Sequence, residues 1–128
     1  MKYLLDTCAF IWLALPQGKL SRAATEVLNN PITELFFSDA GVWEVSLKHA
    51  AGKLALPDVP RKWVPTRLAF YHIAPLSLTR EVIFRSGELP RVHADPFDRL
   101  LAAQAMEAGL TILSPDTPLS LLGASRIW

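Results

Sequence analysis

The sequence has little of what would place it in several large classes of protein. It has a single cysteine, Cys8, which excludes an internal disulfide and a zinc site built from several cysteines. Thirteen Lys and Arg residues nearly balance twelve Asp and Glu residues, so the net charge is only +1. The overall charge therefore gives no sign of nucleic-acid binding, and any such site must be local.

Long apolar runs and glycine-rich phosphate loops are also lacking. Charged residues interrupt every candidate run, so none reaches the roughly 18 apolar residues of a membrane span. The apolar start of the chain is not typical of a signal peptide, because Asp6 interrupts it and no cleavage pattern frames it. We therefore expect a cytoplasmic protein with no membrane partner.

The apolar residues that are present are numerous for the size of the chain. They make up 51% of 128 residues, which is ample for the core of one domain covering 1–128. The mean hydropathy is positive and there are four tryptophans. We expect Trp12, Trp43 and Trp63 to exceed what one small core hides, which predicts a homodimer or another partner surface.

Short apolar runs alternate with stretches of helical periodicity, and this order predicts an α/β fold in which helices wrap a parallel sheet. The predicted strands are 3–5, 35–37, 71–76 and 110–113, with a short edge strand at 125–128. Predicted helices cover 21–30, 38–52, 63–70, 78–86 and 95–109. Ser21 is the expected N-cap of the first, and Gly109 is expected to end the last. The prolines between 54 and 65 predict a loop that leads into the helix at 63–70. The first strand is continuously apolar, which is typical of a strand buried on both faces.

Four carboxylates follow strands or lie early in helices of this pattern: Asp6, Glu44, Asp98 and Asp116. Ligands of open parallel sheets bind beyond the carboxyl ends of the strands, so we expect the four acids to converge there. Clustered carboxylates repel one another unless a cation neutralises them. Oxygen-only ligation favours Mg²⁺ or Mn²⁺ over zinc, and such an ion could support displacement at phosphorus.

Each acid also has a purely structural interpretation. Asp6 could cap a turn, Glu44 could form a surface ion pair with Lys48 four residues later, and Asp116 could be a turn residue. Asp95 fits a helix N-cap, since Pro96 suits the first helical position. We interpret His49, His72 and His93 as structural because none has a partner at ligand spacing, and Cys8 as a small buried hydrophobe.

Four segments of the chain resemble, in order, the blocks of the PIN (PilT N-terminus) domain, and specifically its VapC-type toxin branch. These segments are LLDTCAFIW, SDAGVWEVSLKHAAGKL, HADPFDRLLAAQAMEAGL and TILSPD. The resemblance implies a three-layer α/β/α fold with a central parallel sheet. It also implies an Mg²⁺ or Mn²⁺ site at which Asp6, Glu44, Asp98 and Asp116 act as ligands and catalytic acids.

The same resemblance implies accessory roles and a function. Thr7 and Ser114 would orient water or phosphate, while Asp95 could be a further ligand or only the helix cap. The chain departs from the family pattern at Cys8 and in the proline-containing loop at 114–118. The second departure falls on the loop that carries Asp116, so of the four implied ligands Asp116 matches the family pattern least.

The implied activity is that of a metal-dependent endoribonuclease. It would be the toxin of a type II toxin-antitoxin pair, with RNA as substrate, a cognate antitoxin as partner and a homodimer as its assembly. The alternative is a catalytically silent PIN-fold module that binds RNA or protein. Costly clustered carboxylates argue against that alternative.

Overall fold

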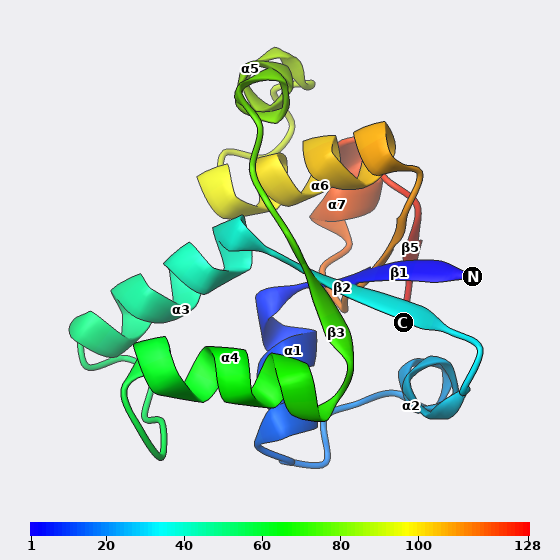
Figure 1. Ribbon diagram of the computed structural model, residues 1–128. Coiled ribbons are helices and arrows are strands. Elements are labelled where there is room, and N and C mark those ends of the chain that lie inside the picture. The colour runs from blue at the N-terminus through cyan, green and yellow to red at the C-terminus, as the bar shows by residue number, and fades with distance from the viewer.

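A computed structural model describes all residues of the chain, 1–128. Five strands form one parallel sheet in the order β3-β2-β1-β4-β5. The strands are β1 (Lys2–Leu5), β2 (Glu34–Ser38), β3 (Ile73–Leu76), β4 (Thr111–Leu113) and β5 (Arg126–Ile127). Helices cover both faces of the sheet (Figure 1): α1 (Thr7–Ala14), α2 (Arg22–Asn29) and α4 (Pro60–Phe70) on one face, and α5 (Arg80–Glu88), α6 (Pro96–Ala108) and α7 (Pro118–Leu121) on the other.

The central strand β1 divides the core into two layers. Successive side chains of a strand point to opposite faces of its sheet. Leu4 accordingly packs with Leu101 and Ile112 on the side of α6 and α7. Leu5 packs with Phe10 and Phe37 on the side of α1. Both leucines are fully buried, which explains why the first strand is continuously apolar.

Helix ends follow the predicted capping residues. The Ser21 hydroxyl accepts a hydrogen bond from the Ala24 N–H at the start of α2. Asp95 caps α6, and Gly109 ends it with a left-handed backbone at φ 68°. These local signals are confirmed because a cap needs only residues within one turn of the helix.

Three parts of the secondary-structure prediction were wrong. Helix α1 was missed because its segment is apolar from Cys8 to Ala14, so no polar face reveals a helical period. Helix α4 begins at Pro60 rather than at residue 63 and continues through Pro65, although a proline inside a helix is unfavourable. The short helix α7 was also missed.

Helix α3 (Asp39–Ala50) leaves the end of β2 and lies beside the carboxyl ends of the strands, at the left of Figure 1. The first turn of α6 lies at the same edge. Asp98 of α6 and Glu44 of α3 are thereby carried to the end of the sheet where Asp6 follows β1. No helix combines the length and the apolar character that a membrane crossing requires.

Close packing of α3 on the sheet depends on Gly41. A Cβ atom at this position would lie 2.5 Å from Cζ and 2.7 Å from Cε1 of Phe37. The Phe37 ring is only 1% exposed, and its centroid lies 4.4 Å from that of Phe10, so it has little room to move. The side chain of any other residue would therefore push α3 away from β2.

We predict that Gly41→Ala lowers the free energy of unfolding by about 1–3 kcal/mol, because overpacking outweighs the better helix propensity of alanine. Gly87→Ala is the matched control, since Gly87 is also helical but nothing lies within 4 Å of its added Cβ. That variant should keep or gain stability. Urea denaturation of both proteins measures the difference, and an equal gain at the two positions would contradict this packing argument.

Candidate metal centre

Asp6 is the most buried carboxylate of the candidate site. It follows β1 as the N-cap of α1, and its Oδ1 accepts a hydrogen bond of 2.7 Å from the Ala9 N–H. The Ser114 hydroxyl donates to Oδ2. Only 4% of Asp6 is exposed. Burial raises the pKa of its carboxyl to about 7 despite these two hydrogen bonds, and the charges of Asp116 and Asp98 add to the rise.

Ser114 and Asp116 reach Asp6 from the other central strand. Ser114 directly follows β4 and is fully buried. Its Oγ accepts a hydrogen bond of 3.0 Å from the Asp116 N–H. The two strands are joined at this point because the Asp6 N–H donates to the Leu113 carbonyl at 3.2 Å. The predicted accessory residue Ser114 thus links Asp6 to the loop that carries Asp116.

Glu44 lies between a hydroxyl and an ammonium group. The Thr7 hydroxyl donates to its Oε1 at 2.6 Å. Lys48 Nζ lies 2.7 Å from its Oε2, and this hydrogen bond raises the pKa of the lysine. The ion pair that the spacing of Glu44 and Lys48 suggested therefore forms. It is not a purely surface pair, however, since the Glu44 side chain is only 16% exposed.

The third part of the site is built at the start of α6. Asp95 Oδ1 accepts hydrogen bonds from the N–H groups of Phe97 at 2.8 Å and Asp98 at 3.2 Å, so the predicted N-cap is confirmed. Asp98 Oδ2 lies 2.7 Å from Nε2 of His93. Burial raises the pKa of Asp98, and the contact with His93 opposes this rise.

The interpretation of His93 as a residue without a partner was wrong. It is five positions before Asp98, and the turn into α6 folds its ring back onto that carboxylate. The only sequence signal was its position two residues before the N-cap. His93, Asp95 and Asp98 form the one group of three potential metal-binding side chains whose ligand atoms all lie within 4.8 Å of one another.

The predicted quartet is brought to one edge of the sheet but does not close into a single tight cluster. The charges of Asp98 and Asp116 raise the pKa of Asp6, although less than burial does. The charges of Asp6, Asp116 and Glu44 likewise add to the rise that burial causes in the pKa of the Cys8 thiol. These effects place the carboxylates within electrostatic range of one another. Nevertheless, the group of three within 4.8 Å contains only Asp98 of the predicted four.

The donors at this edge fit a hard divalent cation. The nearby cationic groups are outnumbered by five carboxylates, those of Asp6, Glu44, Asp95, Asp98 and Asp116. Burial also makes the ionised form of Asp6 costly. A cation would offset both the repulsion and the lost hydration. Burial, followed by the charge of Asp6, raises the pKa of the Cys8 thiol to about 11, so the thiol is protonated at neutral pH.

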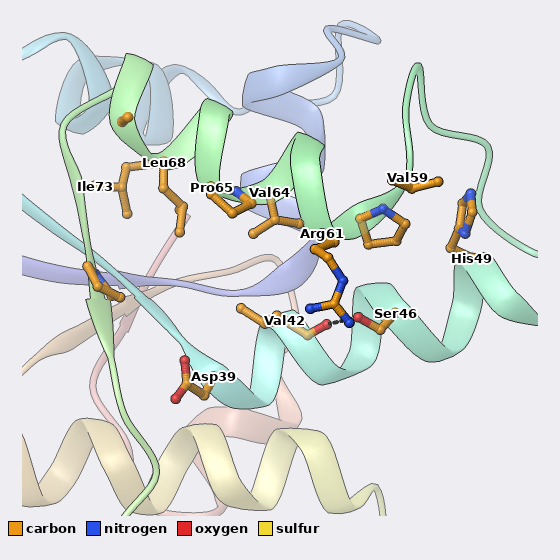
Figure 2. Close-up of a pocket in the computed structure, with 13 residues that line it drawn as sticks. Asp39, Val42, Ser46, His49, Val59, Arg61, Val64, Pro65, Leu68 and Ile73 are labelled. Carbon is orange, nitrogen blue, oxygen red and sulfur yellow. Dashed lines mark hydrogen bonds between the residues drawn. The ribbon is translucent and has the colours of Figure 1, made fainter.

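A large pocket lies away from these acids. It has a volume of about 1060 Å³ and lies between α3, α4 and β3, as Figure 2 shows. The polar and charged side chains around it include Asp39, Ser46, His49 and Arg61, and none of the predicted site acids lines it. Asp6 and Asp98, the acids whose pKa values are raised, lie outside this pocket, and we assign the candidate site to the acidic edge.

The tryptophans differ in their surroundings. Trp63 is only 6% exposed and packs against Phe10 in the core, so counting it as surplus apolar surface was wrong. Trp12 is partly buried against Trp128. Trp43 is 48% exposed and contacts the edge of Phe97, with ring centroids 4.9 Å apart. Only Trp43 is strongly exposed in the way that a partner surface would require.

Solved structures with the same fold cover nearly the whole chain. VapBC2 from Rickettsia felis, bound to a DNA fragment from its promoter, has a TM-score of 0.70 at 14% identity, over 99% of this chain and 98% of that chain. FitAcB from Neisseria gonorrhoeae has a TM-score of 0.66 at 20% identity, over 98% and 96%. DNA-bound VapBC from Salmonella typhimurium has a TM-score of 0.63 at 18% identity, over 100% and 97%. These similarities confirm the predicted three-layer fold.

The sequence itself is similar to one family of domains. None of the curated proteins matches it significantly. The PIN domain family, however, matches residues 3–123, which include every predicted site residue and all strands except β5 and the first residue of β1. With a match of this extent, the chain belongs to the PIN domain family.

Proposed function

We propose that this chain is a metal-dependent endoribonuclease that hydrolyses RNA phosphodiester bonds, and that it is the toxin of a type II toxin-antitoxin pair. The convergence of acids from four remote segments around the buried Asp6 supports this function most directly. A carboxyl whose pKa is raised to about 7 is costly to ionise, which a site for a cation would explain. Structures of a toxin-antitoxin complex from Klebsiella pneumoniae and of a VapBC-family toxin-antitoxin system from Mycobacterium tuberculosis have the same fold, which supports the same function.

We assign the metal ligands to Asp6, Glu44, Asp98 and Asp116. When bound, Mg²⁺ or Mn²⁺ would supply positive charge to phosphate oxygens and acidify water. Ser114 would hold Asp6 and the Asp116 loop in place through its two hydrogen bonds. Thr7 would fix the Oε1 atom of Glu44.

Lys48 would add a positive charge beside the acids. Its side chain is 47% exposed, so its ammonium group can reach an incoming phosphate while it stays close to Glu44. Such a charge favours the approach of an RNA backbone to an otherwise acidic edge.

The partner proposal is that a segment of a cognate antitoxin covers this acidic edge. The segment would present an Arg or Lys side chain to the carboxylates, where it would take the place of the cation and exclude RNA. The structures of FitAB bound to DNA and of a toxin-antitoxin complex from Klebsiella pneumoniae, both with this fold, support such a partner.

We predict that EDTA and Asp6→Asn each abolish RNA cleavage, while Asp6→Asn raises the stability of the metal-free protein. The pKa of Asp6 is raised from 3.8 to about 7, so its protonated form favours folding. The metal-free wild type should therefore lose stability as pH rises from about 4 to 7, by about 1–4 kcal/mol. The asparagine side chain of the variant can keep the hydrogen bond to the Ala9 N–H without the charge.

Gel-based cleavage of a single-stranded RNA and thermal melts in EDTA at pH 5 and pH 7.5 test this prediction. Asp6→Ala is the control, because it removes the N-cap as well as the charge and should melt below Asp6→Asn. Full activity of Asp6→Asn with metal supplied would refute the proposed mechanism. RNA binding without cleavage by the wild type, with metal supplied, would favour the silent PIN-fold module instead.

Asp95 and Asp98 should differ in a second pair of experiments. Asp98→Asn should remove activity at little cost in stability, since the Asp98 carboxylate is proposed to bind the metal and does not cap the helix. Asp95→Ala should cost about 1 kcal/mol through the lost cap, with a smaller loss of turnover. Asp95→Asn, which keeps a capping oxygen, should restore the stability. Kinetics and melts decide the roles: an inactive Asp95→Ala with unchanged melting, beside an active Asp98→Asn, would reverse them.

The exposed side chains of α5 support the proposed homodimer. Ile83 and Phe84 are 51% and 60% exposed, and Val82 is the only buried residue of this helix. We predict that Phe84→Glu shifts a dimer toward monomer in light scattering at micromolar concentration, because it would bury a charge. Phe70→Glu is the control, since Phe70 is 64% exposed on α4, on the opposite side of the sheet. A wild-type protein that is monomeric at that concentration would contradict the dimer.

A further inference from the structure

We propose that His93 is a positioning residue for the metal ligand Asp98: its imidazole holds one carboxylate oxygen and leaves the other to the cation. This inference rests on the proposed function. Nε2 of His93 lies 2.7 Å from Oδ2 of Asp98, whereas no hydrogen bond is formed by Oδ1. The His93 side chain is 26% exposed and that of Asp98 is 20% exposed, so protein shields the contact from most competing water.

The segment that carries His93 is itself fixed to α6. Arg99, the residue after Asp98, donates to four backbone carbonyls: from Nε to Ser86 at 3.0 Å, from Nη2 to Leu89 at 2.8 Å, and from Nη1 to Pro90 at 2.8 Å and His93 at 2.9 Å. A planar guanidinium with five N–H donors suits this task better than an ammonium group. Consecutive residues of one helical turn thus provide the ligand and anchor the loop that positions it.

Both partners of the His93–Asp98 contact therefore have restricted backbones. Asp98 is in the first turn of α6, whose start is set by the Asp95 cap and by Pro96 at the first position. His93 is held through its own carbonyl by Arg99. With both backbones fixed, the hydrogen bond selects one orientation of the Asp98 carboxylate. Outer residues of this kind orient ligands and raise metal affinity in general.

A direct ligand role for His93 is the competing interpretation, because its ligand atom lies within 4.8 Å of those of Asp95 and Asp98. We favour the positioning role, since Nε2 is already engaged with the carboxylate oxygen. Glutamine separates the two roles. Its amide nitrogen can replace Nε2 as a donor to Asp98, but an amide nitrogen, unlike an imidazole nitrogen, has no free lone pair with which to coordinate a metal ion at that position.

The test is the affinity of the full chain for Mn²⁺, measured by electron paramagnetic resonance, with RNA cleavage as a second readout. His93→Ala should raise the Kd for Mn²⁺ by about 10- to 100-fold. His93→Gln should recover most of the lost affinity. His93→Leu, which keeps bulk without a donor, should behave like His93→Ala and serves if the alanine variant folds poorly. His49→Ala is the matched control, since that histidine lines the separate pocket and should leave Mn²⁺ binding unchanged.

The outcomes separate this inference from the proposed function. Equal Mn²⁺ affinity in wild type and His93→Ala would overturn the role of His93 and leave the nuclease proposal intact. His93→Gln as weak as His93→Ala would also overturn the positioning role, in favour of direct ligation. A wild type that binds Mn²⁺ in a His93-dependent way but cleaves no RNA would support the inference while refuting the proposed activity. A wild type that binds no Mn²⁺ would overturn both.

Discussion

The carboxylate of Asp6 bonds to two parts of the chain at once. Its Oδ1 caps α1 through the Ala9 N–H, and its Oδ2 accepts a hydrogen bond from Ser114, which is 108 positions away. Ser114 in turn holds the Asp116 N–H. The central strands β1 and β4, the start of α1 and the loop after β4 therefore meet at one buried acid. Their arrangement depends on a group that is costly to ionise where it lies.

The remaining acids are arranged as two similar hydrogen-bonded groups. Glu44 lies between Thr7 and Lys48, and Asp98 lies beside His93. Each group pairs a carboxylate with one basic side chain, which lowers the cost of holding it close to Asp6. The balance is incomplete, because burial still raises the pKa of Asp98. An edge with such residual negative charge has a physical reason to bind a cation, which the large pocket of Figure 2 lacks.

Much of the fold was predictable because its signals are local. The apolar runs located all five strands, and Ser21, Asp95 and Gly109 marked helix ends through contacts within a single turn. Helix α1 escaped prediction because its run from Cys8 to Ala14 has no polar residue that would reveal a helical period. Its position behind Asp6 is set by the cap and by burial of Phe10 against Phe37 and Trp63, contacts from remote segments that no local pattern contains.

The sequence by itself determined which acids follow strands or lie early in helices. It also determined that they share one edge, because parallel strands bring their carboxyl ends to the same edge whatever the packing in between. Only the tertiary structure decided how these acids are partnered. The spacing of Lys48 and Glu44 allowed their ion pair, but only the structure showed that this Glu44 is largely buried and that His93 contacts Asp98. The physical reason is that a hydrogen bond requires placement to within a few tenths of an ångström, and spacing along a chain fixes only which face or turn a residue shares.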